Sequence, residues 1–104
     1  MKSITVQELK QKRNKKEKIN LLDVREAKEL SIASIHGAIH IPMIEIPNRI
    51  HELDKEKPIA VMCHEGVRSS QVCMYLDQFG FDAYNIEGGI HAWSLEIDPS
   101  VKTY

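Results

Sequence analysis

The chain alternates short runs of apolar residues with longer stretches in which apolar positions recur every three or four residues. Short apolar runs are typical of strands, and the longer spacing is typical of helices with one buried face. A strand that is apolar throughout is usually covered on both faces, as in parallel sheets. The runs expected to form strands are residues 19–24, 38–42, 58–63 and 82–86.

Helices are predicted between these runs. Thr5 is a favourable N-cap residue and Glu8 completes a capping box, so the first helix is expected from Val6 to about Asn14. Two further helices are expected over residues 27–32 and 87–93. A third is expected around Pro47, where Ile46, Ile50 and Leu53 form a buried stripe. A fourth is expected along Val72, Leu76 and Phe79 and would end at Gly80.

Strands that alternate with helices predict a mainly parallel sheet with helices on both faces, an α/β fold. A chain of 104 residues can bury one modest core, so we expect residues 1–104 to form a single domain.

Composition and charge set limits on partners and on cellular location. The formal net charge of −1 gives no general attraction to nucleic acids or anionic membranes. No apolar run reaches the length of about 20 residues needed to cross a bilayer, and the first residues lack the apolar run of a secretory signal. We therefore expect a cytoplasmic protein whose two cysteines are free thiols, with no nucleic-acid or membrane partner.

A basic run over residues 10–18 carries six positive charges and one negative charge. It has no aromatic residue on which bases could stack, so nucleic-acid binding is not expected. The run is either the solvated end of the first helix or a docking surface for an acidic protein partner.

Cys63 is the strongest candidate for chemistry. It ends a predicted buried strand, and in parallel α/β sheets ligands bind beyond the carboxyl ends of strands. Residues 64–68 would form the turn into a helix, with Ser69 and Ser70 in its first turn. The N–H groups of that turn and the nearby Arg68 favour a thiolate and lower the cysteine pKa. Cys73 lies in an apolar helical stripe and is expected to be an inert core residue, with a resolving thiol as the alternative.

Four stretches of the chain resemble, in order and spacing, the signature stretches of the rhodanese (sulfurtransferase) homology domain. They are "LLDVRE" (21–26), "IHGAIHIP" (35–42), "CHEGVRS" (63–69) and "NIEGGIHAW" (85–93). The resemblance covers a core of about residues 4–93, as in a stand-alone single-domain member. Residues 94–104 match no signature.

This resemblance implies a central, mainly parallel five-stranded sheet and a catalytic Cys63 that cycles through a persulfide. A donor such as thiosulfate would load the sulfur, and cyanide or a thiol would accept it, in some cases on a sulfur-relay protein. The expected site comprises the loop residues His64, Glu65, Gly66, Val67, Arg68 and Ser69, supported by Asp23 and Arg25, with no cofactor or metal ion.

Loop length separates two activities of this fold. The resemblance implies that, in this fold, six residues from the cysteine through the arginine go with sulfur transfer, whereas one residue more goes with phosphatases and arsenate reductases. The count from Cys63 to Arg68 is six, and Glu65 would repel a phosphate dianion. A cysteine-dependent phosphatase remains an alternative, as does a sulfur-carrier or regulatory module with low turnover.

The two arginines allow more than one interpretation. Arg68 could bind the sulfonate of a donor, or it could pair with a carboxylate beneath the loop, for which Asp23 is the expected partner. Arg25 could contact substrate, but we expect a surface ion pair with Glu26 or Glu29.

Three other features receive structural interpretations. His64 is expected to be a solvated loop residue, although a role in proton transfer stays open. His36 and His40 do not share a helical face, so a metal site with Cys63 is not expected. Gly88 and Gly89 are expected to permit a tight turn. The family often has proline in place of Ala27 and a glycine-histidine pair in place of Ala33 and Ser34, so the loop before residue 35 is expected to differ in shape.

Overall fold

A computed structural model describes every residue from Met1 to Tyr104. Five strands form one sheet in the order β1-β5-β4-β2-β3, and every neighbouring pair is parallel. The strands are β1 (Lys2–Ile4), β2 (Asn20–Asp23), β3 (Ile39–His40), β4 (Ile59–Met62) and β5 (Ala83–Ile86). The predicted mainly parallel sheet is therefore confirmed and is parallel throughout.

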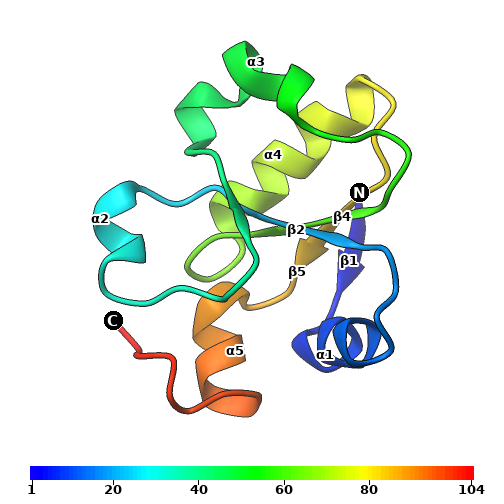
Figure 1. Cartoon of the computed structure of the whole chain (residues 1–104). Coiled ribbons are helices and arrows are strands. Elements are labelled where there is room, and N and C mark those ends of the chain that lie inside the picture. Colours follow the sequence, from blue (N-terminus) through cyan, green and yellow to red (C-terminus); the bar gives the residue numbers. More distant parts are fainter.

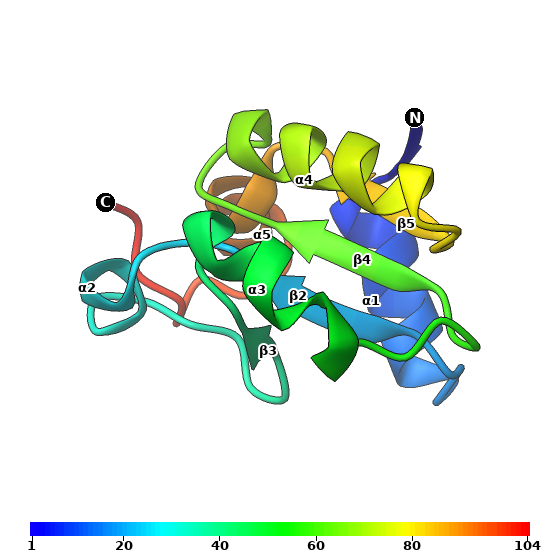
Figure 2. The same cartoon turned by 90° about the horizontal axis from the view of Figure 1, so that it is seen from above.

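Helices cover both faces of the sheet (Figures 1 and 2). One face carries α3 and α4, the other carries α1 and α5, and α2 lies beside the carboxyl ends of the strands (Figure 1). The helices are α1 (Val6–Asn14), α2 (Ala27–Leu30), α3 (Ile46–Arg49), α4 (Val67–Gln78) and α5 (Gly89–Glu96), with 3-10 turns η1 (Met43–Glu45) and η2 (Ile50–Glu52) flanking α3.

The central strand β4 supplies side chains to two separate cores. Ile59 and Val61 pack into the core beneath α3 and α4, whereas Ala60 and Met62 pack into the core above α1 and α5. Successive side chains of a strand point to opposite faces, so a strand buried on both sides must be apolar at every position. This is why residues 58–63 form a continuous apolar run.

Strand β1 is the element that the apolar pattern did not predict. Only Ile4 of its three residues is buried, because β1 lies at the edge of the sheet, where Lys2 and Ser3 face solvent. An edge strand with one buried side chain has no apolar run by which it could be recognised.

The helix predicted around Pro47 is present but shorter than expected: only Ile46–Arg49 is α-helical, with Pro47 in its first turn as predicted. The segment consists of the three short turns η1, α3 and η2. Pro47 has no N–H, so it cannot donate the hydrogen bond that would continue the preceding turn. Ile46 and Leu53 still reach the core, which explains the helical spacing.

Two other predictions need correction at the level of single elements. Phe79 does not belong to the buried face of α4: it follows the helix and is 45% exposed. Strand β3 and helix α2 are shorter than predicted, and they belong to the part of the chain where Ala33 and Ser34 depart from the family pattern. The capping box of Thr5 and Glu8 is present as predicted.

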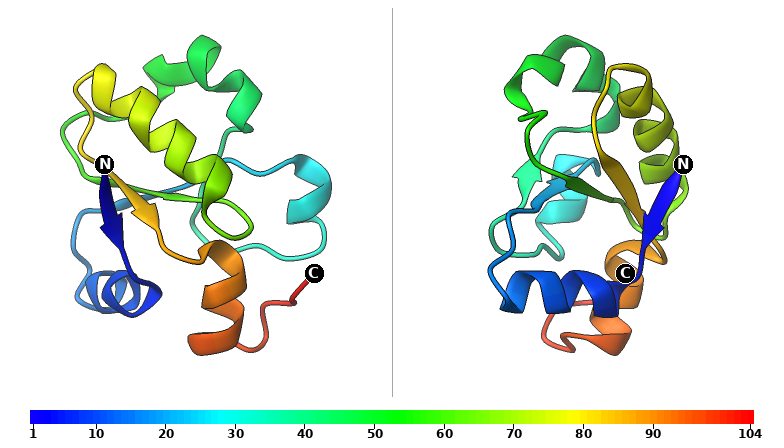
Figure 3. Two further views of the ribbon diagram at one scale, coloured as in Figure 1. Left: turned by 180° about the vertical axis from the view of Figure 1, so that it is seen from behind. Right: turned by 90° about the vertical axis from the view of Figure 1, so that its right-hand side faces the viewer.

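The chain leaves α5 without further regular structure and turns back toward α2 (Figure 3). None of the helices has the length and apolar character needed to span a membrane.

Candidate active site

The loop from Cys63 to Gly66 joins the carboxyl end of β4 to the first turn of α4. Gly66 is the residue before the helix and has a φ of +114°, a left-handed conformation that favours glycine. This conformation turns the Gly66 N–H back toward the preceding strand, where it donates a hydrogen bond to Cys63 Sγ at 3.1 Å. The predicted position of Cys63 at a strand end is confirmed.

The Cys63 thiol is buried and surrounded by hydrogen-bond donors. The residue is only 1% exposed, and burial alone would raise its pKa. The hydroxyl and N–H of Ser69, together with the N–H groups of Gly66 and Glu65, outweigh burial and hold the pKa of the Cys63 thiol below its ordinary value. The loop therefore favours a thiolate, as expected for a nucleophile.

Ser69 and Asn85 form a small buried network beneath the sulfur. Ser69 Oγ lies 3.3 Å from Cys63 Sγ and donates to Asn85 Oδ1 at 2.5 Å. Asn85 Nδ2 in turn donates to the carbonyl of Gly66 at 3.2 Å, which ties β5 to the loop. Sequence reasoning missed Asn85, although an amide within an apolar strand was a usable signal, since buried polar groups require partners.

Helix α5 holds the other side of the loop. The N–H of Ile90 donates to the carbonyl of Cys63 at 3.0 Å, and the N–H of His91 donates to that of His64 at 3.1 Å. A Cβ on Gly89 would lie 2.5 Å from the carbonyl oxygen of His64, so only glycine permits this approach. The first turn of α5 therefore fixes the backbone at the nucleophile.

Arg68 does not pair with Asp23, so that prediction is wrong. Its guanidinium donates to both carboxylate oxygens of Glu29, at 2.7 and 2.9 Å. This forked pair is the first cause that lowers the pKa of Glu29 to about 2. The carboxylate comes from α2 because that helix lies beside the catalytic loop.

Asp23 and Arg25 instead pair with each other, and the predicted surface pairing of Arg25 is also wrong. Both side chains are fully buried, and Arg25 Nη2 lies 2.7 Å from Asp23 Oδ2. Arg25 Nη2 also donates to the carbonyl of Ala33 at 2.8 Å. A fully buried arginine requires such partners, because leaving it unpaired would cost several kcal/mol. The pair therefore fixes the end of β2 beneath the site.

Tyr104 is a site residue that no pattern in the sequence indicated. Its hydroxyl accepts from Arg25 Nη1 at 2.9 Å and donates to Glu29 Oε2 at 2.7 Å. Its ring stacks on that of His64, with the centroids 4.1 Å apart and the planes 9° apart. His64 is therefore covered by an aromatic ring and is not a solvated loop residue as predicted.

The remaining predicted loop residues form the outer rim. Glu65 and Val67 are both exposed, and the Glu65 carboxylate lies 3.9 Å from His64 Nδ1. Cys73 is fully buried, and burial raises the pKa of its thiol to about 12. A buried thiol with a raised pKa stays protonated at neutral pH and is a poor nucleophile. This supports the interpretation of Cys73 as a core residue over a role as a resolving thiol.

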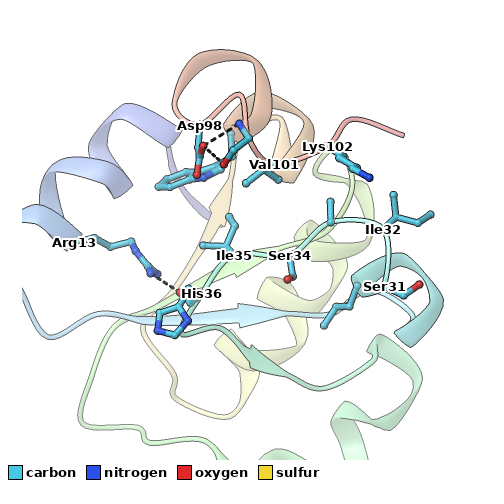
Figure 4. A pocket seen from close by; sticks show the side chains of 13 residues that line it. Arg13, Ser31, Ile32, Ser34, Ile35, His36, Asp98, Val101 and Lys102 are labelled. Atoms are coloured by element: carbon cyan, nitrogen blue, oxygen red, sulfur yellow. Dashed lines mark hydrogen bonds between the residues drawn. The ribbon is translucent and has the colours of Figure 1, made fainter.

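A separate hollow of about 550 Å³ lies between the chain after α5 and the loop before β3 (Figure 4). Its lining includes Arg13, His36, Asp98 and Lys102, and no residue of the 63–69 loop. His40 lies elsewhere, with Nε2 2.7 Å from the carbonyl oxygen of Arg25. The structure brings together no group of three side chains of the kinds that hold a metal ion.

Comparisons with known proteins agree with this geometry. The chain is 42% identical over 99 residues to a Bacillus subtilis protein named "Putative sulfurtransferase YtwF", covering 95% of this chain and 96% of that protein. It is 37% identical over 86 residues to a protein of Allochromatium vinosum named "Sulfurtransferase", covering 82% and 80% of the two.

The same family is found among solved structures. The crystal structure of a rhodanese-like domain protein from Staphylococcus aureus matches with a TM-score of 0.88 and 38% identity, over 100% of this chain and 99% of that one. A family model described as "Rhodanese-like domain" matches residues 5–96. The resemblance seen in the four sequence stretches is confirmed: the chain belongs to the rhodanese-like domain family.

Proposed function

We propose that this sulfurtransferase moves a sulfane sulfur from a donor such as thiosulfate to a thiol or cyanide through a persulfide on Cys63. The observation that carries the proposal is the position of Cys63 Sγ, which accepts from the Gly66 N–H at 3.1 Å and lies 3.3 Å from Ser69 Oγ. These donors stabilise a thiolate before reaction and a persulfide anion after it.

In the first half-reaction, the Cys63 thiolate attacks the outer sulfur of thiosulfate. The sulfur–sulfur bond of the donor breaks, and sulfite leaves with the electron pair of that bond. Cys63 then carries one additional sulfur as a persulfide anion. The N–H groups of the loop remain aimed at the sulfur throughout, so they need no rearrangement as charge moves.

In the second half-reaction, a cyanide ion or an acceptor thiolate attacks the outer sulfur of the persulfide. The bond between that sulfur and Cys63 Sγ breaks, and the Cys63 thiolate leaves with its electron pair. The product is thiocyanate or a new persulfide. Because the enzyme is altered between the two steps, ping-pong kinetics follow.

Two alternatives are less well supported. A phosphatase needs a cradle for a dianion, but the Arg68 guanidinium is committed to Glu29 and Glu65 adds a negative charge at the rim. A regulatory module that only docks a partner would not need the hydrogen-bond donors that surround the Cys63 sulfur and hold the pKa of its thiol below the ordinary value.

Initial rates of thiocyanate formation, with thiosulfate and cyanide varied together, test the proposal. We expect parallel double-reciprocal lines, and a loss of about 10³-fold or more in Cys63→Ser. The matched control is Cys73→Ala, which removes the other thiol and should retain the rate. Activity that survives in Cys63→Ser would contradict the mechanism.

Two substitutions of reagent test the donor and the phosphatase alternative. Repeating the assay with glutathione persulfide as donor shows whether the protein uses a donor other than thiosulfate through the same Cys63 persulfide. Release of p-nitrophenol from p-nitrophenyl phosphate that depends on Cys63 would favour the phosphatase and contradict sulfur transfer as the main activity.

A further inference from the structure

The side chains of the second and sixth residues of the catalytic loop are joined by two residues from outside it. His64 stacks on the Tyr104 ring, and the Tyr104 hydroxyl donates to Glu29 at 2.7 Å. Glu29 then binds Arg68 through both oxygens. This chain of contacts, which we call the rim bridge (His64, Tyr104, Glu29 and Arg68), connects both ends of a loop whose cysteine is only 1% exposed.

The segment that carries Tyr104 has few other attachments. After Val101, whose N–H donates to the carbonyl of Asp98, the hydrogen bonds of the chain are those of the Tyr104 hydroxyl. The segment also borders the hollow of about 550 Å³, through Asp98, Val101 and Lys102 (Figure 4). Val101 packs against the core above α1 and α5, and beyond it the segment is held by the ring and the hydroxyl of Tyr104.

A second observation concerns the His64 ring, which has an unsatisfied hydrogen-bonding atom. His64 Nε2 is buried and has no hydrogen-bond partner. Buried polar atoms without partners are rare and costly, so each calls for an explanation such as a bound water, an ion or a catalytic role. The unpaired nitrogen belongs to the ring on which Tyr104 stacks, one residue from the nucleophile.

We propose that Tyr104 is a specificity-determining residue of the sulfur-transfer site, which covers the His64 side of the loop and restricts the size of groups that reach Cys63. The inference rests on the proposed function for its biological meaning. Glu65 and Val67 are exposed, whereas the Tyr104 ring covers that of His64. We therefore expect small donors and acceptors to reach the sulfur with Tyr104 in place, and bulkier ones to require Tyr104 to move.

Alkylation of Cys63 with two reagents that share one reactive group but differ in size tests the proposal without relying on sulfur transfer. The reagents are iodoacetamide and its fluorescein derivative, and the measured quantity is the ratio of their second-order rate constants in a Cys73→Ala background. In Tyr104→Ala we expect the bulky reagent to gain about 10-fold relative to the small one. Tyr104→Phe, which keeps the ring but loses both hydrogen bonds of the hydroxyl, should show a smaller gain.

The matched control is Phe79→Ala, because Phe79 is similarly exposed, 45% against 37% for Tyr104, and lies beyond α4. It should leave the ratio unchanged. Far-UV circular dichroism and the melting temperature identify any variant that is simply unfolded. A ratio in Tyr104→Ala within about twofold of the unsubstituted protein would overturn the proposal.

The same variants, loaded with persulfide and mixed with 2-mercaptoethanol or glutathione, separate this inference from the proposed function. A selective gain for glutathione in Tyr104→Ala supports both. If the alkylation ratio changes but the protein never forms a persulfide, the result supports the role of Tyr104 in restricting access to Cys63 and refutes sulfur transfer.

Discussion

The Ser69 hydroxyl has one proton and two acceptors within reach. It donates to Asn85 Oδ1 at 2.5 Å, and Cys63 Sγ lies 3.3 Å from its oxygen. A neutral thiol can donate to Ser69 while Ser69 donates to Asn85. Once the thiol loses its proton, the same hydroxyl can turn and donate to the thiolate. The Ser69 hydroxyl can therefore donate to the sulfur when the sulfur is charged and accept from it when it is neutral.

This role predicts the effect of Ser69→Ala on the reactivity of the nucleophile. Loss of a donor to the thiolate disfavours the charged form, so the pKa of the Cys63 thiol should rise. The pH profile of iodoacetamide alkylation should then move to higher pH, and the rate at neutral pH should fall several-fold. Ser70→Ala is the matched control, because its hydroxyl bonds only the carbonyl of Val67. Equal shifts in both variants would refute the assignment.

At the scale of elements, the catalytic loop is held by the first turns of two helices. The turn into α4 directs the N–H groups of Gly66 and Ser69 toward the sulfur. Helix α5 donates to the carbonyls of Cys63 and His64. The approach of α5 depends on Gly89, whose missing side chain leaves room for the carbonyl of His64. The family stretch that contains Gly88 and Gly89 thus positions the nucleophile.

Two glycines with positive φ allow this claim to be tested. At Gly89, with a φ of +58°, a Cβ would overlap backbone atoms of residues 63 and 64, whereas at Gly80, with a φ of +84°, it would meet no atom within 4 Å. We expect Gly80→Ala to cost about 1–2 kcal/mol in free energy of unfolding, and Gly89→Ala about 3 kcal/mol or more. Urea unfolding measures both. Gly89→Ala should also reduce sulfurtransferase turnover, and equal behaviour of the two variants would argue against this packing.

At the scale of the whole molecule, sequence patterns correctly predicted the features that depend on residues close together in the chain. The capping box of Thr5 and Glu8, the buried run of β4 and the turn after it follow from neighbouring residues, and each lies where predicted. With the family resemblance, they gave the fold and the position of Cys63.

Some of the contacts that were predicted wrongly or missed join residues distant in the sequence. Glu29 is 39 positions from Arg68 and 75 from Tyr104, and their meeting depends on how α2 and the end of the chain pack around the sheet. Asp23 pairs with a residue only two positions away, but that pairing was hidden because nothing in the sequence showed that Arg25 would be fully buried. Spacing along the chain does not encode either fact.

A persulfide on Cys63 is the intermediate on which the proposed function depends, and mass spectrometry tests for it most directly. After incubation with thiosulfate or glutathione persulfide and removal of excess reagent, the intact protein should gain one sulfur, about 32 Da. Peptide mapping should place the gain on the peptide with Cys63, and cyanide should remove it. The same gain in Cys63→Ser, or a gain located on Cys73, would contradict the account.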